Sequence, residues 1–155
     1  MWFSRKQVVK PPPDGSQAQP GQVTTKSRGD AAESAAQVFL ARAGLIPVER
    51  NYRTPGRGGG EIDLVMRTPD GTLVFVEVRQ RSGASHGGAA ASISPVKQQR
   101  IIFAARHYLM RFASPPPCRF DVVLVHGTLK QGQAPVHGEG EQGRIEWLPA
   151  AFDAS

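Results

Sequence analysis

The sequence predicts an α/β fold in which helices pack on a β-sheet, and three observations support this. Residues 60–79 contain two segments of alternating apolar residues on either side of the turn Pro69-Asp70-Gly71, which is typical of a β-hairpin. Residues 94–112 have one apolar arc at helical spacing. An apolar run after Cys118 is typical of a buried central strand. A helix whose apolar arc packs on these strands gives an α/β protein.

The 155 residues are enough for one domain with a modest hydrophobic core. Residues 1–26 are rich in Pro, Gly, Gln and Ser and bury too little apolar surface to offset their ordering entropy. We therefore expect a disordered N-terminal tail over residues 1–26 and one domain over residues 27–155.

The first predicted helix covers residues 28–43. Ser27 to Asp30 fits a capping box, and Gly44 stands where a helix C-terminus favours glycine. Small and apolar residues recur at helical spacing in between. Glu33, in the second turn, is explained from the residues alone as an anion near the positive end of the helix dipole.

Residues 45–51 are predicted to form an edge strand, with Pro47 on its exposed side. A basic, glycine-rich loop follows and continues to Gly60. Its Arg53 and Arg57 either contact a phosphate backbone or belong to a plain flexible connection.

The second predicted helix begins with Ser94 as N-cap and Pro95 as first helical residue. We expect its apolar arc to pack on the sheet. Its basic arc is either a solvated face or, as the overall charge favours, a nucleic-acid contact. That arc consists of Lys97, Arg100, His107 and Arg111.

Gln98 falls inside the apolar arc, where a polar group needs a hydrogen-bond partner. It points either toward an acidic cluster or to a single hydrogen bond with a loop. After this helix, residues 118–125 are predicted to form the buried strand, with Asp121 capping it or pairing with Arg119. A short last strand over residues 144–148 and one helical turn over residues 149–152 complete the chain.

Acidic residues interrupt the apolar pattern of the hairpin and predict a metal site. With a three-residue turn, Thr68 pairs with Thr72, and counting back places Asp63 opposite Glu77 and Glu61 opposite Arg79. Two opposed carboxylates destabilise a sheet unless a positive charge lies between them. Hard oxygen ligands suit Mg²⁺ or Mn²⁺, whereas compensation by nearby arginines is the structural alternative. A two-residue loop would shift this register by one.

The formal net charge of +6 favours polyanionic partners, with nucleic acid ahead of an acidic membrane surface and of an ordinary basic protein with no such partner. The single cysteine, Cys118, excludes an internal disulfide and is typical of a reduced, cytoplasmic protein. We also expect no membrane association, because the sequence contains neither an apolar run long enough to span a bilayer nor a signal-peptide pattern.

Four blocks of sequence carry a family resemblance: G-E-I-D-L-V, F-V-E-V-R, S-P-V-K-Q and C-R-F-D-V-V. They resemble, in order, the YraN-type family of uncharacterised bacterial proteins, which is similar in fold to archaeal Holliday-junction resolvases of the PD-(D/E)XK nuclease superfamily. The resemblance covers residue 25 to the C-terminus. It implies a restriction-endonuclease-like fold, with a mixed central sheet flanked by helices, and recognition of branched or structured DNA.

The resemblance also assigns residues. Asp63 stands at the motif Asp, Glu77 at the motif Glu, and Glu33 at a helix Glu that supplies a further acidic metal ligand. Lys97 and Gln98 stand where related nucleases place a supporting polar residue. Cleavage of both strands of a symmetric junction needs two sites, which a homodimer would supply.

Arg79 stands where the motif has lysine. Arginine stays protonated, so Arg79 can stabilise charge or hold Glu61 but cannot serve as a general base. Three hypotheses follow: a metal-dependent endonuclease acting on branched DNA, a nucleic-acid-binding protein with a nuclease fold and little catalysis, and an interaction module whose acidic pair is only structural.

Overall fold

The computed structural model describes residues 25–81, 93–127 and 144–154. These residues form, in chain order, α1 (Thr25–Arg42), β1 (Ile46–Arg53), β2 (Glu61–Arg67), β3 (Leu73–Arg81), α3 (Pro95–Leu109), β4 (Cys118–His126) and β5 (Arg144–Phe152). Most of the predicted tail lies outside the described residues, as do residues 82–92 before α3 and residues 128–143 before β5.

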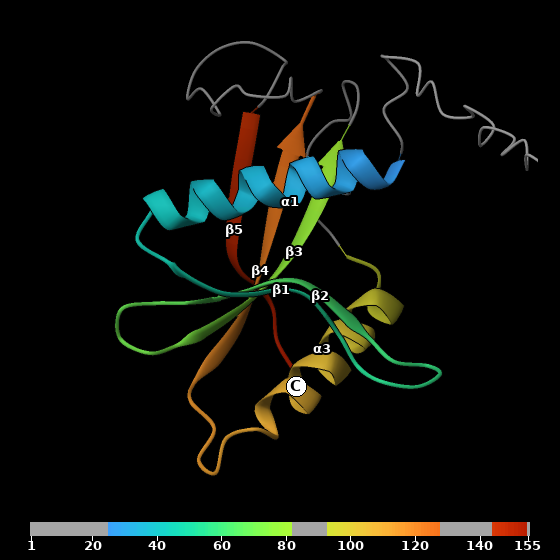
Figure 1. The fold of residues 1–155 in the computed structure, drawn as a ribbon, viewed down its shortest axis with the longest axis vertical. Coiled ribbons are helices and arrows are strands. Elements are labelled where there is room, and N and C mark those ends of the chain that lie inside the picture. Colours follow the sequence, from blue (N-terminus) through green and yellow to red (C-terminus); the bar gives the residue numbers. More distant parts are fainter. Residues whose placement is uncertain (1–24, 82–92, 128–143, 155) are drawn as a thin grey trace, which may run out of the picture.

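The five strands make one mixed sheet in the order β1-β2-β3-β4-β5. The β3–β4 pair is parallel, and the other three pairs are antiparallel. Figure 1 shows β1 and β2 lying across the direction of β3, β4 and β5, with α1 on one side of the sheet and α3 on the other. This confirms the predicted α/β class, and the arrangement is that of a restriction-endonuclease-like fold.

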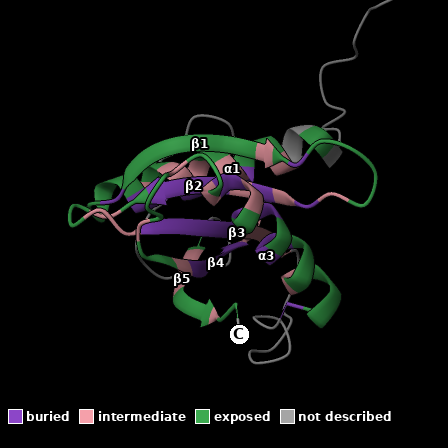
Figure 2. Ribbon diagram, turned by 90° about the horizontal axis from the view of Figure 1, so that it is seen from below, coloured by how far each residue is buried: buried purple, intermediate pink, exposed green. Residues whose placement is uncertain are grey.

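Each face of the sheet has its own core. Helix α3 packs on the first face, where Tyr108 and Phe75 are among the largest buried side chains. Helix α1 packs on the second face through Ala32, Ala36 and Leu40, which are fully buried at helical spacing. The central strands β2, β3 and β4 are buried between these layers, whereas β1 is exposed at the edge (Figure 2).

The hairpin turn has the predicted form. The backbone N–H of Thr68 donates to the carbonyl of Thr72 over 2.9 Å, and Gly71 adopts a φ of 95° in the left-handed region. The side chain of Asp70 closes the turn, because its carboxylate accepts hydrogen bonds from the hydroxyl of Thr68 and the backbone N–H of Thr72. The register with Val65 opposite Phe75 is confirmed.

Both helices form where the sequence predicts them, with shifted ends. Helix α1 begins at Thr25, so Ser27 lies inside its first turn and does not precede it as a capping box requires. Gly44 follows this helix with a φ of 105°, as expected. Ser94 caps α3 and accepts a hydrogen bond from the N–H of Lys97, and the helix ends at Leu109, before the predicted end at residue 112.

The predicted helical turn over residues 149–152 is wrong, because β5 continues to Phe152. The reason lies in Asp121 of β4, which is completely buried. Its carboxylate pairs with Arg119 at 3.1 Å and accepts hydrogen bonds of 2.9 Å from the indole of Trp147 and from the backbone N–H of Ala150. The β4–β5 register shifts beside Asp121, so this carboxylate holds β5 across an irregularity that would otherwise end the strand.

We predict that Asp121→Ala destabilises the protein by about 3 kcal/mol, because it removes the buried carboxylate that pairs with Arg119 and accepts hydrogen bonds from Trp147 and Ala150. Urea unfolding followed by circular dichroism measures this change. Asp153→Ala is the control, since Asp153 is exposed just beyond β5. Equal midpoints for the two variants would contradict the role given to Asp121.

Candidate metal centre

The sheet forks at Asp63 and Glu77. The β2–β3 ladder ends at the pair Leu64 and Val76. Beyond it, β2 stays paired with β1 while β3 stays paired with β4 as far as Arg81. The next residues on each side of the fork are Asp63 and Glu77. The predicted juxtaposition therefore occurs at the point where the two strands separate.

Asp63 replaces the lost strand pairing at the fork. Its Oδ2 accepts a 2.8 Å hydrogen bond from the backbone N–H of Val78, a donor that lies past the end of the ladder. A buried N–H without an acceptor would cost free energy, so the side chain satisfies the backbone of the neighbouring strand. The same bond fixes the Asp63 carboxylate beside the side chain that precedes Val78, which is Glu77.

Glu77 is buried, with a residue exposure of 8%, and pairs with Lys97 of α3. The Lys97 Nζ lies 3.4 Å from the Glu77 Oε1, and the lysine side chain is 46% exposed. Lys97 was predicted to be a nucleic-acid contact on the basic arc and, from the family resemblance, a supporting polar residue of the site. The structure places its ammonium group at Glu77, and contact with nucleic acid stays a prediction.

The helical spacing also indicates that Lys97 lies at the edge of the core, which its assignment to the basic arc did not take into account. On a helical wheel, Lys97 falls on the same face as Ile101, Ala104 and Tyr108, which are all buried. A lysine at the start of a buried stripe must direct its charge toward an acidic partner at the edge of the core. Glu77 is that partner.

The surroundings of Asp63 disfavour its charged form. Burial, and then the neighbouring charge of Glu77, raise the pKa of Asp63 from 3.8 to about 7. The Val78 hydrogen bond and Lys97 oppose this shift without cancelling it. The pair therefore has an excess of negative charge that another cation would compensate.

Glu33 approaches the same region from α1 but is occupied by Arg50. The Oε2 of Glu33 lies 3.6 Å from the Arg50 Nη2, and Arg50 also contacts Ser34. Burial raises the pKa of Glu33, and the charge of Asp63 raises it further. The two carboxylates thus influence each other electrostatically, and the role of Glu33 as a third ligand stays a prediction.

The carboxylates of Asp63 and Glu77 are a ligand set that a divalent cation such as Mg²⁺ can use. In the part of the chain that the structure describes, no three His, Cys, Asp or Glu side chains are grouped closely enough to hold a metal. Mg²⁺ is commonly bound by one or two carboxylates together with waters and substrate phosphates. A pair of partly buried carboxylates with excess negative charge fits that coordination, and Mn²⁺ accepts the same ligands.

The predicted pairing of Glu61 with Arg79 is wrong. The β2–β3 ladder stops before reaching these residues, and Glu61 pairs with Arg53 of β1 both in register and through a 3.4 Å ion pair. Arg79 is partly buried on β3, with Leu124 of β4 as its neighbour in the ladder. The strand alternation that places Glu77 toward α3 places Arg79 on the same face.

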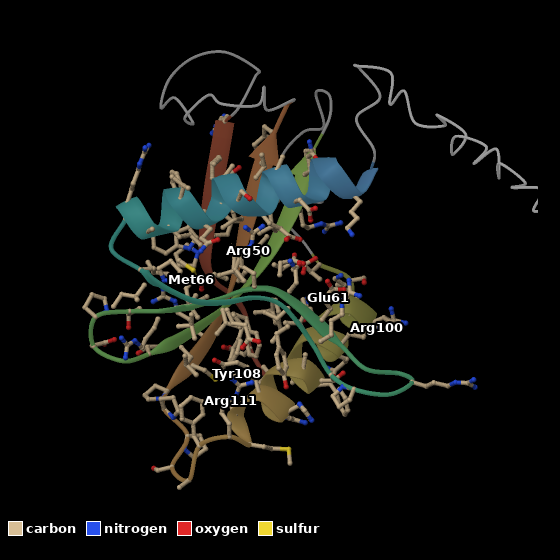
Figure 3. All side chains as sticks on the ribbon, viewed as in Figure 1. Arg50, Glu61, Met66, Arg100, Tyr108 and Arg111 are labelled. Carbon is tan, nitrogen blue, oxygen red and sulfur yellow. The ribbon has the colours of Figure 1, made fainter. Side chains whose placement is uncertain are left out.

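The side-chain amide of Gln98 donates a 2.9 Å hydrogen bond to the carbonyl of Ile93. This is the loop hydrogen bond that the sequence allowed as the alternative, and a catalytic role for Gln98 stays a prediction. Arg111 lies over the ring of Tyr108 (Figure 3), with 3.7 Å from its guanidinium carbon to the ring centre. It also pairs with Glu49, and its role as a nucleic-acid contact stays a prediction.

Arg57 and Arg100 remain exposed, as a phosphate contact requires. Arg57 lies in the loop between β1 and β2. Gly60 allows that loop to lie against α3, because a Cβ atom at this position would stand only 1.9 Å from the backbone oxygen of Arg100. This close approach brings the basic loop beside the N-terminal half of α3.

In the described residues no helix is long and apolar enough to cross a membrane.

We predict that Asp63→Asn stabilises the metal-free protein more at pH 8 than at pH 5. The raised pKa means that the folded state keeps its proton where the unfolded state has lost it, so ionising Asp63 costs stability as the pH rises from about 4 to about 7. Asparagine removes that cost. The melting temperature in EDTA should rise at pH 8 by at least about 3 °C, the shift that ~1 kcal/mol gives at this chain length.

Asp153→Asn is the matched control for that measurement, and its effect should not depend on pH. If Asp63→Asn changed the melting temperature equally at both pH values, the raised pKa of Asp63 would be ruled out.

Comparisons with known proteins agree with the family resemblance. The model of the uncharacterised protein family UPF0102 matches residues 32–125, which run from α1 to β4 and include Glu33, Asp63 and Glu77. The chain is 91% identical over 155 residues to a UPF0102 protein of Polaromonas sp. strain JS666, covering all of both chains. It is 74% identical to the UPF0102 protein of Polaromonas naphthalenivorans strain CJ2, again over all of both chains.

A more distant relative is the UPF0102 protein of Cupriavidus taiwanensis, which is 57% identical over 129 residues. That alignment covers 83% of this chain and 85% of the relative. Because the family model spans more than half of the chain and these relatives span most of it, the chain belongs to the UPF0102 family, the YraN-type family that its motifs resemble.

Proposed function

We propose that this protein is a cytoplasmic Mg²⁺- or Mn²⁺-dependent endonuclease that hydrolyses phosphodiester bonds of branched or structured DNA. One observation carries the proposal: Asp63 and Glu77 lie together at the fork of the sheet, short of positive charge, with Lys97 beside them. The nuclease motif expects an acidic pair at these two positions. The net charge of +6 favours a polyanionic substrate.

Asp63 and Glu77 would hold the cation. Asp63 is fixed by the Val78 N–H, and Glu77 is fixed by burial and by Lys97, so both carboxylates are oriented before any ion arrives. A divalent cation bound there would polarise the scissile phosphate, lower the pKa of a bound water and neutralise charge in the transition state.

Lys97 would supply the positive charge that the motif expects from its lysine. It comes from α3, next to the motif Glu, whereas Arg79 occupies the motif position on β3. A cation fixed close to the carboxylates can stabilise charge that develops on the phosphate. Exposed Arg57 and Arg100 would contact the DNA backbone on the same side of the molecule.

A second candidate function is nucleic-acid binding with little or no catalysis. Arg79 favours it, because an arginine at the motif position cannot take a proton from water. Metal binding and cleavage, measured separately, distinguish the two functions. A homodimer with two such sites would suit cleavage of a symmetric junction.

We predict that Mn²⁺ binds the protein at pH 8 and at least about ten-fold more weakly at pH 5.5. Binding needs both carboxylates ionised, and the Asp63 pKa of about 7 means that the ion must displace a proton at the lower pH. Isothermal titration calorimetry of the EDTA-treated protein measures the affinity, and repeating it in buffers of different ionisation enthalpy measures the released proton.

Asp63→Asn should abolish this binding, whereas Asp153→Asn should bind Mn²⁺ like the wild type. An equal signal from both variants would place the ion elsewhere, and no signal from the wild type would remove the metal site from the proposal.

We predict that the wild type cleaves junction or flap DNA with Mg²⁺ or Mn²⁺, and that Glu77→Gln lowers the rate by at least about 100-fold through loss of a metal ligand. Lys97→Met should lower it by about 100-fold, the usual effect of removing one group that stabilises charge in a transition state. Gel electrophoresis of labelled substrates measures both rates.

Glu49→Gln is the matched control for cleavage, since Glu49 is an exposed carboxylate of β1 paired with Arg111. Cleavage that persists in Glu77→Gln would indicate a contaminating nuclease. Wild-type protein that binds junction DNA and Mn²⁺ without cleaving would favour the second candidate function.

A further inference from the structure

The outward side of α3 carries a groove of which the proposed site uses only Arg100. It has a volume of about 530 Å³ and lies between the helix and Gly58 of the β1–β2 loop. Val96, Ile102 and Phe103 supply its apolar lining, and Arg100 and Arg106 lie at its edges. We call this feature the α3 groove.

Phe103 and Val96 are exposed, although neither is needed for the core. Phe103 has an exposed fraction of 54% and Val96 of 65%, while the opposite face of the same helix buries Ile101 and Ala105 almost completely. Met110, with 78% exposed, continues the line, because residues seven apart fall on one side of a helix. Exposed apolar side chains, one of them aromatic, along one side of a helix indicate an interaction surface.

The charge around the strip selects the kind of partner. Helix α3 contains no Asp or Glu between Pro95 and Leu109, whereas Lys97, Arg100 and Arg106 are all basic. A second copy docking through this face would bring Arg100 and Arg106 of both copies together without a compensating acid. A nucleic-acid strand offers both complements at once: negative phosphates for the arginines and flat base surfaces for Phe103.

The groove also lies next to the carboxylate pair. Lys97, which contacts Glu77, directly follows Val96 in the chain. On the helical wheel, Arg100 falls between Lys97 and Phe103, and the rise along the helix axis from Lys97 to Phe103 is about 9 Å. A strand leaving the carboxylate pair and passing Arg100 would therefore reach Phe103 after a short path.

We infer that the α3 groove binds unpaired nucleotides of a single-stranded segment beside the duplex, with one base stacked on Phe103 and the phosphates paired with Arg100 and Arg106. This inference rests on the proposed function in taking nucleic acid as the substrate, and it narrows that substrate to DNA with an unpaired stretch. Stacking accepts any base, because every base has an aromatic face.

Fluorescence anisotropy in EDTA tests the inference without any cleavage. The probes are labelled oligothymidine of about 12 nucleotides, within the site size of single-strand binding modules, a flap duplex and a blunt duplex. The wild type should bind the oligothymidine and the flap more tightly than the blunt duplex. Phe103→Ala should weaken those two about ten-fold, the effect of losing one stacked base, and should change blunt-duplex binding less than about two-fold, since that binding rests on phosphate contacts.

Two further variants separate stacking from apolar contact. Phe103→Trp should keep the affinity, and its fluorescence should be quenched when a base stacks on the indole. Phe103→Leu, which keeps an apolar side chain without an aromatic face, should lose affinity as Phe103→Ala does. Val38→Ala is the matched control, because Val38 is an exposed apolar residue of α1 on the other side of the sheet.

The outcomes are distinct. Wild-type binding that does not distinguish flap from blunt duplex, or Phe103→Leu binding like the wild type, overturns the inference and leaves the proposed nuclease intact. Sedimentation that shows a dimer which Phe103→Ala disrupts would assign the groove to a second copy of the chain. Binding of anionic phospholipid vesicles that Phe103→Ala abolishes, without binding of oligothymidine, would assign it to a membrane surface. Either result overturns the inference. Failure of the wild type to bind any DNA overturns the inference and the proposed function together.

Discussion

The hydrogen bond from the Val78 N–H to the Asp63 carboxylate is the constraint on which the rest of the site depends. Beyond Leu64, β2 remains paired with β1 and β3 remains paired with β4, while the ladder between β2 and β3 has ended. A strand donor at the fork then needs an acceptor, and Asp63 supplies it. The consequence is a carboxylate fixed beside Glu77, with the Asp63 pKa raised to about 7 by burial and by that neighbour.

The two buried acidic centres of this protein differ in how their negative charge is compensated. Asp121 has no exposed surface, yet Arg119, Trp147 and Ala150 all donate to it, so its negative charge is fully compensated. Among the described residues, Asp63 accepts one backbone hydrogen bond, from Val78, and Glu77 pairs with one lysine, Lys97. A buried carboxylate with a complete set of donors stabilises the fold, whereas a pair without one has capacity for a further cation.

Each layer of the fold brings a different group to the fork. Helix α3 brings Lys97 to Glu77 from one face, and the same helix presents Arg100, Phe103 and Arg106 outward along the α3 groove. Helix α1 brings Glu33 from the other face, held by Arg50 of β1. The loop between β1 and β2 approaches α3 closely at Gly60, which brings its basic residues beside that helix. Carboxylates, fixed cation and groove thus lie on connected parts of one side of the sheet, as a site for a long polyanion requires.

The sequence by itself determined the local elements: the three-residue hairpin turn, the register that joins Val65 to Phe75, the Ser94 cap and the Gly44 terminus all depend on neighbouring residues and formed as predicted. Alternation within two strands was likewise enough to bring Asp63 near Glu77. Only the tertiary structure decided where the β2–β3 ladder ends. Because it ends before Glu61, this residue pairs with Arg53 and not with Arg79. It also decided that Glu77 is the partner of Lys97 and that β5 runs on past Pro149, because these outcomes depend on which strands and helices meet. A helical wheel can place Lys97 on the buried face of α3, but the identity of a partner in a distant segment leaves no periodic signal in either segment.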